Sequence, residues 1–161
     1  MPDLHPDVAP VAALIGVWAG QGRGVYPTIA PFGYLEEVTF THVGKPFLSY
    51  IQKTKAIDDG RPLHAETGYL RVPAAGRVEL VLAHPTGVTE IEEGTVSVHG
   101  TTIEMVLAAT SIGLSGSAKE VTALGRSIQV DGDELTYTVS MGAVGQPLQK
   151  HLTATLHRKQ A

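Results

Sequence analysis

The chain of 161 residues contains no cysteine, which excludes a disulfide, a thiolate nucleophile, an iron–sulfur cluster and a thiolate-ligated haem. Any transition metal must therefore be held by histidine, by a carboxylate or by the ring of a cofactor. Charged residues are also scarce, at 17% of the chain against roughly 25% in a typical soluble domain. Glycine, in contrast, occurs 18 times. This balance favours sheets and turns over surface helices.

Excess basic charge and long apolar runs are lacking as well. Twelve basic residues stand against 16 acidic ones, and the net charge of -4 gives no electrostatic footprint for nucleic acid or an anionic membrane. No apolar run approaches the roughly 18 residues of a membrane span, and residues 1–10 lack the basic and apolar regions of a signal peptide. We therefore predict a cytoplasmic protein with no nucleic-acid or membrane partner.

What is present is a succession of strand patterns. Residues 8–15 can form one or two helical turns, and residues 1–9 are predicted to be a flexible tail. Apolar segments with period-two or continuous patterning then alternate with short turns, and no helical stretch of 10 to 15 residues separates them, which argues against parallel βαβ units. The predicted strands are residues 17–26, 35–43, 47–57, 63–72, 77–84, 87–98, 101–109, 119–130, 134–142 and 148–158.

Alternation within these segments predicts how the sheet closes. Leu135, Tyr137, Val139 and Met141 share one face of their strand, so one face of the sheet is expected to be dry and the other wet. Closure would remove the exposed edges of such a sheet. We predict an all-β fold, a closed antiparallel up-and-down barrel of about ten strands forming one domain over residues 1–161. A two-sheet sandwich with a filled core is the alternative.

The most unusual stretch is Gly16-x-Trp18-x-Gly20-x-Gly22-x-Gly24-x-Tyr26-Pro27-Thr28-Ile29. Its glycines at 20, 22 and 24 leave one strand face without side chains, so another backbone or a flat ligand can come close. The GxGxG spacing, with no helix after it, is not that of a dinucleotide-binding loop. As a structural element, Trp18 is predicted to plug one end of the barrel.

This motif, together with Ser117-Ala118-Lys119 and Gln149-Lys150-His151-Leu152, resembles the nitrobindins, which are small haem-binding barrels related in shape to fatty-acid-binding proteins. The likeness covers nearly the whole chain. It implies one haem b per chain in the Fe(III) state, reversible binding of nitric oxide, and an enzyme that isomerises peroxynitrite to nitrate, as a monomer or homodimer. By the same resemblance, His151 is the axial iron ligand, Thr28 lies near the haem edge, Lys119 approaches a propionate and Met141 lines the cavity.

The residues alone leave the choice of ligand open among seven histidines. His5 lies in the expected tail, and His84 and His99 lie in expected turns. The remaining candidates with similar standing are His42, His64, His151 and His157. Strict alternation places His151 on the wet face, so a loop or a β-bulge must re-aim it. His157, which has the same parity, is the weaker alternative.

Two rival functions follow from the same barrel. One is a carrier of fatty acid or another hydrophobic ligand, although we identify no interior arginine or tyrosine arrangement that would hold a carboxylate. The other is haem storage or nitric oxide sensing. No GxSxG elbow, HExxH pair or paired-carboxylate spacing is identified, so general acid–base groups are not expected and the chemistry would belong to a bound iron.

Overall fold

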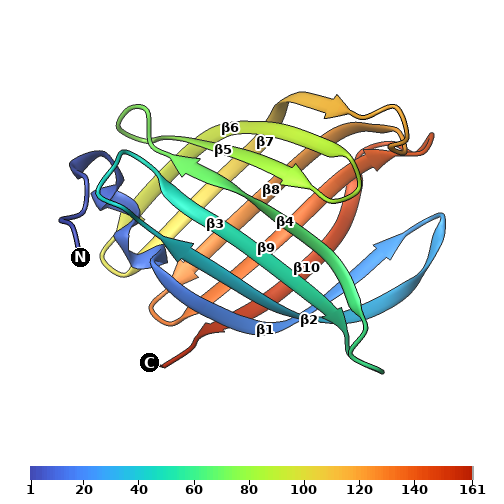
Figure 1. Ribbon diagram of the computed structural model, residues 1–161, viewed down its shortest axis with the longest axis horizontal. Coiled ribbons are helices and arrows are strands. Elements are labelled where there is room, and N and C mark those ends of the chain that lie inside the picture. Colours follow the sequence, from blue (N-terminus) through green and yellow to red (C-terminus); the bar gives the residue numbers. More distant parts are fainter. Residues whose placement is uncertain (161) are drawn as a thin grey trace.

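The computed structural model describes residues 1–160 and shows a closed antiparallel barrel of ten strands with one short 3-10 helix (Figure 1). Each strand pairs with its neighbours in sequence, and β1 also pairs with β10, which closes the barrel. This register confirms the predicted barrel and excludes the sandwich. The elements are η1 (Pro6–Leu14), β1 (Gly16–Tyr26), β2 (Ile29–Thr41), β3 (Leu48–Ala56), β4 (Pro62–Arg71), β5 (Arg77–His84), β6 (Val88–His99), β7 (Thr102–Leu114), β8 (Val121–Asp131), β9 (Glu134–Ala143) and β10 (Gln149–Arg158).

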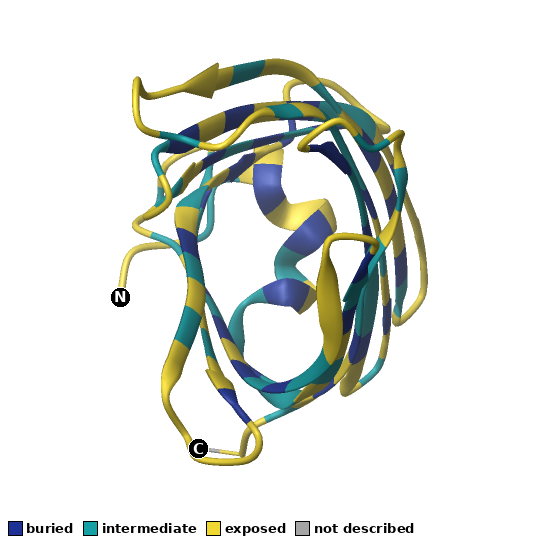
Figure 2. Ribbon diagram, turned by 90° about the vertical axis from the view of Figure 1, so that its right-hand side faces the viewer, coloured by how far each residue is buried: buried dark blue, intermediate teal, exposed yellow. Residues whose placement is uncertain are grey.

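The helix η1 closes one end of the barrel. Figure 2 looks along the bore and shows the helix lying across its far end. Val8, Val11 and Leu14 are fully buried, so the segment expected as a tail already contains the start of this helix. The Trp18 indole N–H donates to the carbonyl of Leu14 at 2.9 Å, which places this side chain at the closed end as expected.

No helix of residues 1–160 covers the opposite end of the barrel, which we call the open end. It is formed by the connections between β1 and β2, β3 and β4, β5 and β6, β7 and β8, and β9 and β10. The hairpin of β1 and β2 projects beyond the other strands at this end (Figure 1). Among residues 1–160, no helix is long and apolar enough to cross a membrane.

The barrel interior has two different halves. Towards the closed end it is apolar, with Trp18, Phe40, Leu48, Ile103 and Leu156 all at most 3% exposed. Towards the open end it carries charge, which corrects the expectation of a uniformly dry inner face. The buried polar side chains of this half are those of Glu36, Gln52, Glu66, Glu90, Glu92 and Arg126.

The glycines of β1 lie under neighbouring groups. A Cβ at Gly20 would overlap the backbone of β10, so a second backbone does come close, as expected. A Cβ at Gly22 would overlap the ring of Tyr34, and one at Gly24 would overlap the ring of Phe32. Aromatic side chains of β2 therefore cover the glycine face of β1 at Gly22 and Gly24, where the sequence also allowed a flat ligand.

Candidate functional site

His151 lies at a β-bulge near the start of β10. The pairing between β9 and β10 passes from Lys150 opposite Ser140 to Leu152 opposite Val139, so His151 is the extra residue. A bulge places two successive side chains on one side of a strand and re-aims the one between regular pairs. Strict alternation along the strand would place His151 on the outer, solvent-facing side of the sheet. The bulge is the kind of local distortion that can turn its side chain away from that side.

Two residues of β1 hold the His151 imidazole. Its Nδ1 lies 2.9 Å from the carbonyl oxygen of Val25, and because a carbonyl only accepts hydrogen bonds, Nδ1 carries the proton. The Tyr26 ring packs edge-on against the imidazole with centroids 5.2 Å apart. The Tyr26 hydroxyl accepts the N–H of Ala143 at 2.9 Å, which fixes the tyrosine in turn. In the neutral imidazole the lone pair then lies on Nε2, which has no hydrogen-bond partner among residues 1–160.

The other residues assigned by resemblance all lie towards the open end. Met141, near the end of β9, is half-buried, and its carbonyl accepts the Tyr26 hydroxyl at 3.1 Å. Thr28 is exposed in the turn between β1 and β2, and Lys119 is exposed in the connection between β7 and β8. His157 is exposed on β10, where it pairs with Glu134. His151 and His157 thus lie near opposite ends of β10.

A buried charge cluster occupies the interior of the barrel. We define it as Glu66, Glu90, Glu92 and Arg126. The Arg126 guanidinium donates through Nη1 to Glu66 at 3.1 Å, through Nη2 to Glu90 at 2.9 Å and through Nε to Glu92 at 2.5 Å. Tyr50 also donates to Glu66, at 2.7 Å. One guanidinium therefore faces three carboxylates inside the barrel.

Burial and the guanidinium act in opposite directions on these carboxyls. Burial raises the pKa of Glu92 to about 7, although Arg126 lowers it in part. Burial would also raise the pKa of Glu66, but Arg126, His84 and the Tyr50 hydroxyl together hold it below its usual value. Desolvation would lower the pKa of Arg126, yet the surrounding carboxylates hold it above its usual value. The guanidinium stays charged.

A second polar network lies beside this cluster. The Tyr137 hydroxyl lies 2.7 Å from that of Tyr34 and donates to Glu36 at 2.5 Å. Gln52 donates to the other oxygen of Glu36 at 2.8 Å. Burial raises the pKa of Glu36 to about 7, and the two hydrogen bonds lower it only in part. The open half thus holds two carboxyls that titrate near neutral pH.

His64, one of the four candidate histidines, and His84, which was expected in a turn, meet at the wall formed by β4 and β5. His84 is the last residue of β5, and its Nδ1 lies 2.8 Å from Nε2 of His64. Its Nε2 lies 3.0 Å from Glu90. Partial loss of water lowers the pKa of His64, so this imidazole is neutral at pH 7.

The interior carboxylates and arginine were missed because β-strand alternation was followed only through apolar residues. In β6, Val88 and Val96 are buried and Ile91 is exposed, so residues of even number face inwards. Glu90 and Glu92 have that parity and form a carboxylate pair on one face. Continuing the alternation from Val88 to Val96 would have found them, which corrects the statement that no paired carboxylates occur.

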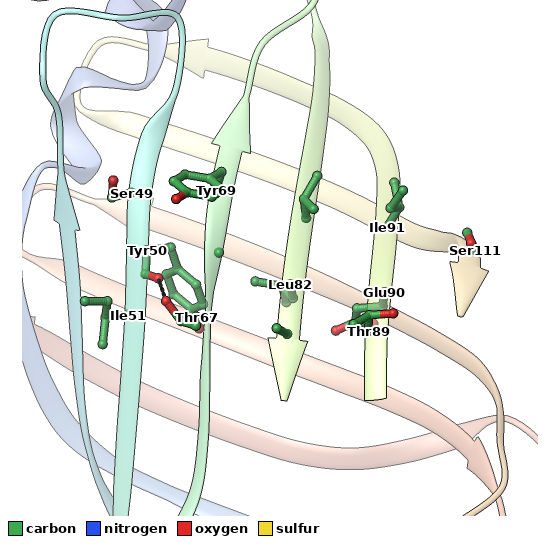
Figure 3. Close-up of a pocket in the computed structure, with 13 residues that line it drawn as sticks. Ser49, Tyr50, Ile51, Thr67, Tyr69, Leu82, Thr89, Glu90, Ile91 and Ser111 are labelled. Carbon is green, nitrogen blue, oxygen red and sulfur yellow. Dashed lines mark hydrogen bonds between the residues drawn. The ribbon is translucent and has the colours of Figure 1, made fainter. Parts of the chain in front are cut away.

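A separate hollow of about 560 Å³ lies on the outer wall over β3 to β7 (Figure 3). Outward side chains such as those of Ile51, Tyr69 and Ile91 line it, and they are 40% exposed or more. None of the residues assigned by resemblance lines this hollow. It is therefore distinct from the site around His151.

Comparison with known proteins gives this geometry its context. Residues 7–158 match the model of the THAP4-like, heme-binding beta-barrel domain. The chain belongs to this family. The chain is 69% identical to "Peroxynitrite isomerase 1" of Mycolicibacterium paratuberculosis (strain ATCC BAA-968 / K-10) and 63% identical to "Peroxynitrite isomerase" of Mycobacterium leprae (strain TN), with 98% of each chain covered. The crystal structure of Rv2717c from M. tuberculosis is 62% identical and superposes with a TM-score of 0.96 over 98% of this chain and 100% of that one.

Haem is the cofactor of this family, and the residues present fit it. An axial ligand to haem iron must offer a neutral nitrogen lone pair when no thiolate exists. A hydrogen bond from the other ring nitrogen to a backbone carbonyl is the usual way in which a protein orients such a ligand. The hydrogen bond from Nδ1 of His151 to Val25 meets the second condition, and in the neutral imidazole it leaves the lone pair on Nε2.

Proposed function

We propose that this protein is a haem-dependent enzyme that isomerises peroxynitrite to nitrate, with His151 as the axial ligand of the iron. The single observation that carries the proposal is the His151 imidazole, whose Nδ1 is hydrogen-bonded to Val25 while Nε2 has no partner among residues 1–160, in a member of a haem-binding barrel family. The names of the relatives at 62 to 69% identity supply the reaction.

The chain's own residues bind and orient. Val25 fixes the tautomer of His151, and the edge of Tyr26, itself tied to Ala143, restricts rotation of the imidazole. When bound, ferric haem b supplies an iron coordination position at which peroxynitrite can rearrange to nitrate. The carboxyls of Glu36 and Glu92, with pKa values of about 7, can hold or release protons within the barrel.

Further assignments belong to the same proposal. Met141 would line the cofactor cavity, Thr28 would lie near the haem edge, and Lys119 would approach a propionate from the connection before β8. Their positions at the open end support these roles. One Fe(III) haem per chain, nitric oxide as a second ligand, a monomeric or homodimeric state and a cytoplasmic location stay predictions from the sequence.

The fatty-acid carrier is less well supported because of how Arg126 is used. From the sequence no interior arginine could be assigned, whereas the structure has one, Arg126, buried inside the barrel. Its guanidinium already donates to three carboxylates of the chain. An added carboxylate would meet net negative charge there and would have to displace Glu66, Glu90 or Glu92.

The axial ligand is tested by titrating hemin into the wild type, His151→Ala and His157→Ala. We expect the Soret band of the His151→Ala complex to shift or weaken and exogenous imidazole to restore it, while His157→Ala behaves as the wild type. A His151→Ala spectrum and affinity equal to those of the wild type would remove His151 from the proposal. Preference for a fluorescent fatty acid over hemin by orders of magnitude would favour the carrier.

The reaction is tested separately with the haem-loaded protein. Stopped-flow decay of peroxynitrite, with nitrate and nitrite measured at the end, should be faster than in buffer and should yield mainly nitrate. Haem-loaded His151→Ala should lose most of this acceleration. A nitrate yield and decay rate equal to those of buffer would leave a protein that binds haem without this activity.

A further inference from the structure

A second group of potential metal ligands lies at the open end, away from His151. Nε2 of His64 lies 2.8 Å from Nδ1 of His84, and Nδ1 of His84 lies 3.5 Å from Oε2 of Glu66. These three atoms all lie within 4.8 Å of one another. Ligands about 2.0 to 2.1 Å from a tetrahedral metal ion are separated by roughly 3.3 Å, so small side-chain movements would let all three atoms bind one ion.

The fold explains why these three side chains meet. His64 and Glu66 are two residues apart on β4, so they point to the same side of the sheet. On the neighbouring strand β5, Ala83 pairs with Thr67, and His84 is the next residue. Antiparallel register therefore brings His84 opposite Glu66. The arrangement rests on regular strands and not on a mobile loop.

Glu90 completes the arrangement from β6. Its Oε1 lies 3.0 Å from Nε2 of His84, and a carboxylate at that distance keeps the proton on Nε2. In the neutral imidazole, which is the form that binds a metal, Nδ1 of His84 is then the nitrogen with a lone pair, and it faces His64 and Glu66. A carboxylate behind a ligating histidine is the common way to orient it in zinc sites.

The charge of the surrounding cluster also favours a cation. Three carboxylates face one guanidinium, and both Oε2 of Glu90 and Oε1 of Glu92 are buried with no hydrogen-bond partner among residues 1–160. Buried carboxylate oxygens without partners are costly, and an added positive charge nearby would offset part of that cost. Arg126 carries a single positive charge, which cannot balance three carboxylates, and each of its three nitrogens already donates to one of them.

We propose that His64, Glu66 and His84 bind one divalent transition-metal ion of the Zn²⁺ class. Two imidazoles and one carboxylate match the ligand preference of Zn²⁺ and its neighbours, whereas Ca²⁺ and Mg²⁺ prefer oxygen ligands alone. The site is separate from the one around His151. In the ring of ten strands, β5 is five strands from β10 in either direction. His84 and His151 therefore lie on opposite sides of the barrel at its open end.

The test is a Zn²⁺ titration by calorimetry on the full chain, with and without bound hemin. We expect one saturable site per chain in both states. His64→Ala and His84→Ala should each weaken Zn²⁺ binding by about 100-fold or more, and Glu90→Gln, which acts through His84, by about 10- to 100-fold. His157→Ala, an exposed histidine on β10, is the matched control and should bind Zn²⁺ as the wild type does. Excess Ca²⁺ should not compete.

Two outcomes would overturn this proposal. Absence of saturable Zn²⁺ binding, or equal affinity in the wild type and His64→Ala, would show that the three side chains do not form a metal site. A Soret band that shifts in His64→Ala without any loss of Zn²⁺ affinity would assign His64 to the haem site instead. His64 is exposed, so loss of folding is not expected, and thermal unfolding of each variant checks this.

Discussion

The two halves of the barrel interior differ in chemistry: the closed half is apolar and the open half is polar and charged. The closed half packs a 3-10 helix and Trp18 against aliphatic side chains, with almost all of them fully buried. The open half buries Arg126 among three glutamates, with a second network around Glu36. Burial of apolar area stabilises the first half, whereas buried charges contribute little net stability. We infer that the closed half supplies most of the stability of the fold. The open half can therefore contain polar and charged groups that contribute little stability.

The largest effect that separates the halves is expected from Arg126→Met. Removing the guanidinium leaves three buried carboxylates without their common partner, which costs about 3–5 kcal/mol in the free energy of unfolding. The cost should be greatest at pH 8 and smaller at pH 5, where the carboxyls can take up protons. Urea unfolding at both pH values measures this. Arg71→Met, which removes an exposed pair with Glu79, is the control; an Arg126→Met cost that does not change with pH would contradict the picture of a charge-governed half.

Trp18→Ala is the matching change in the closed half. Loss of a fully buried indole, its hydrogen bond to Leu14 and its contact with the Arg158 guanidinium should cost about 3–5 kcal/mol. Because this environment is mainly apolar, the cost should be the same at pH 5 and pH 8. Trp18→Phe, which keeps a ring, should recover a large part of it. A clear pH dependence for Trp18→Ala would show that the two halves are coupled.

The stability of the wild-type protein should itself depend on pH because of the buried carboxyls of the open half. Burial raises the pKa of Glu36 and Glu92 from 4.5 to about 7, so between these values the folded state binds more protons than the unfolded state. Stability from these groups is therefore present below about pH 4.5 and is lost as the pH rises to 7, by at most about 3 kcal/mol for each group. Glu66, whose pKa is lowered, acts in the opposite sense and destabilises the fold at lower pH.

Glu92→Gln isolates one of these groups. The free energy of unfolding, measured by urea at several pH values between 4.5 and 8, should fall less steeply in this variant than in the wild type. Glu104→Gln, an exposed carboxylate on β7, should leave the slope unchanged. Identical slopes for the wild type and Glu92→Gln would mean that Glu92 keeps an ordinary pKa in the folded protein.

The sequence predicted the closed half and the fold well, for a physical reason. Period-two alternation of apolar residues is a local signal, and short turns such as Asp131-Gly132-Asp133 force neighbouring strands to pair. All ten strands were therefore found. The errors lie at strand ends, since β2 begins at Ile29 and β7 continues to Leu114, where polar and proline residues hide the pattern.

The open half was predicted poorly because its stability depends on contacts between distant residues. Arg126 is 34 residues from Glu92 and 60 from Glu66, so no local pattern marks them as partners. A bulge that depends on pairing between β9 and β10 likewise cannot be read from β10 alone, and only the resemblance favoured His151 over His157. The family motif supplied the candidate residues, and strand alternation could have placed Glu90 and Glu92 inside the barrel, but their pairing with Arg126 could not be read from the sequence.

The smallest expected effect concerns the glycine motif, which runs from the closed half to the open one. In Gly22→Ala, the new methyl group would overlap the Tyr34 ring, which is buried and tied to Tyr137, so the ring cannot move away freely. Overpacking of this kind costs about 1–3 kcal/mol. Gly116→Ala is the control, because a Cβ there meets nothing within 4 Å. Thermal unfolding should show a lower Tm for Gly22→Ala only; an unchanged Tm would mean that β1 and the tyrosine network can shift together, so that the motif does not serve to seat the Tyr34 ring.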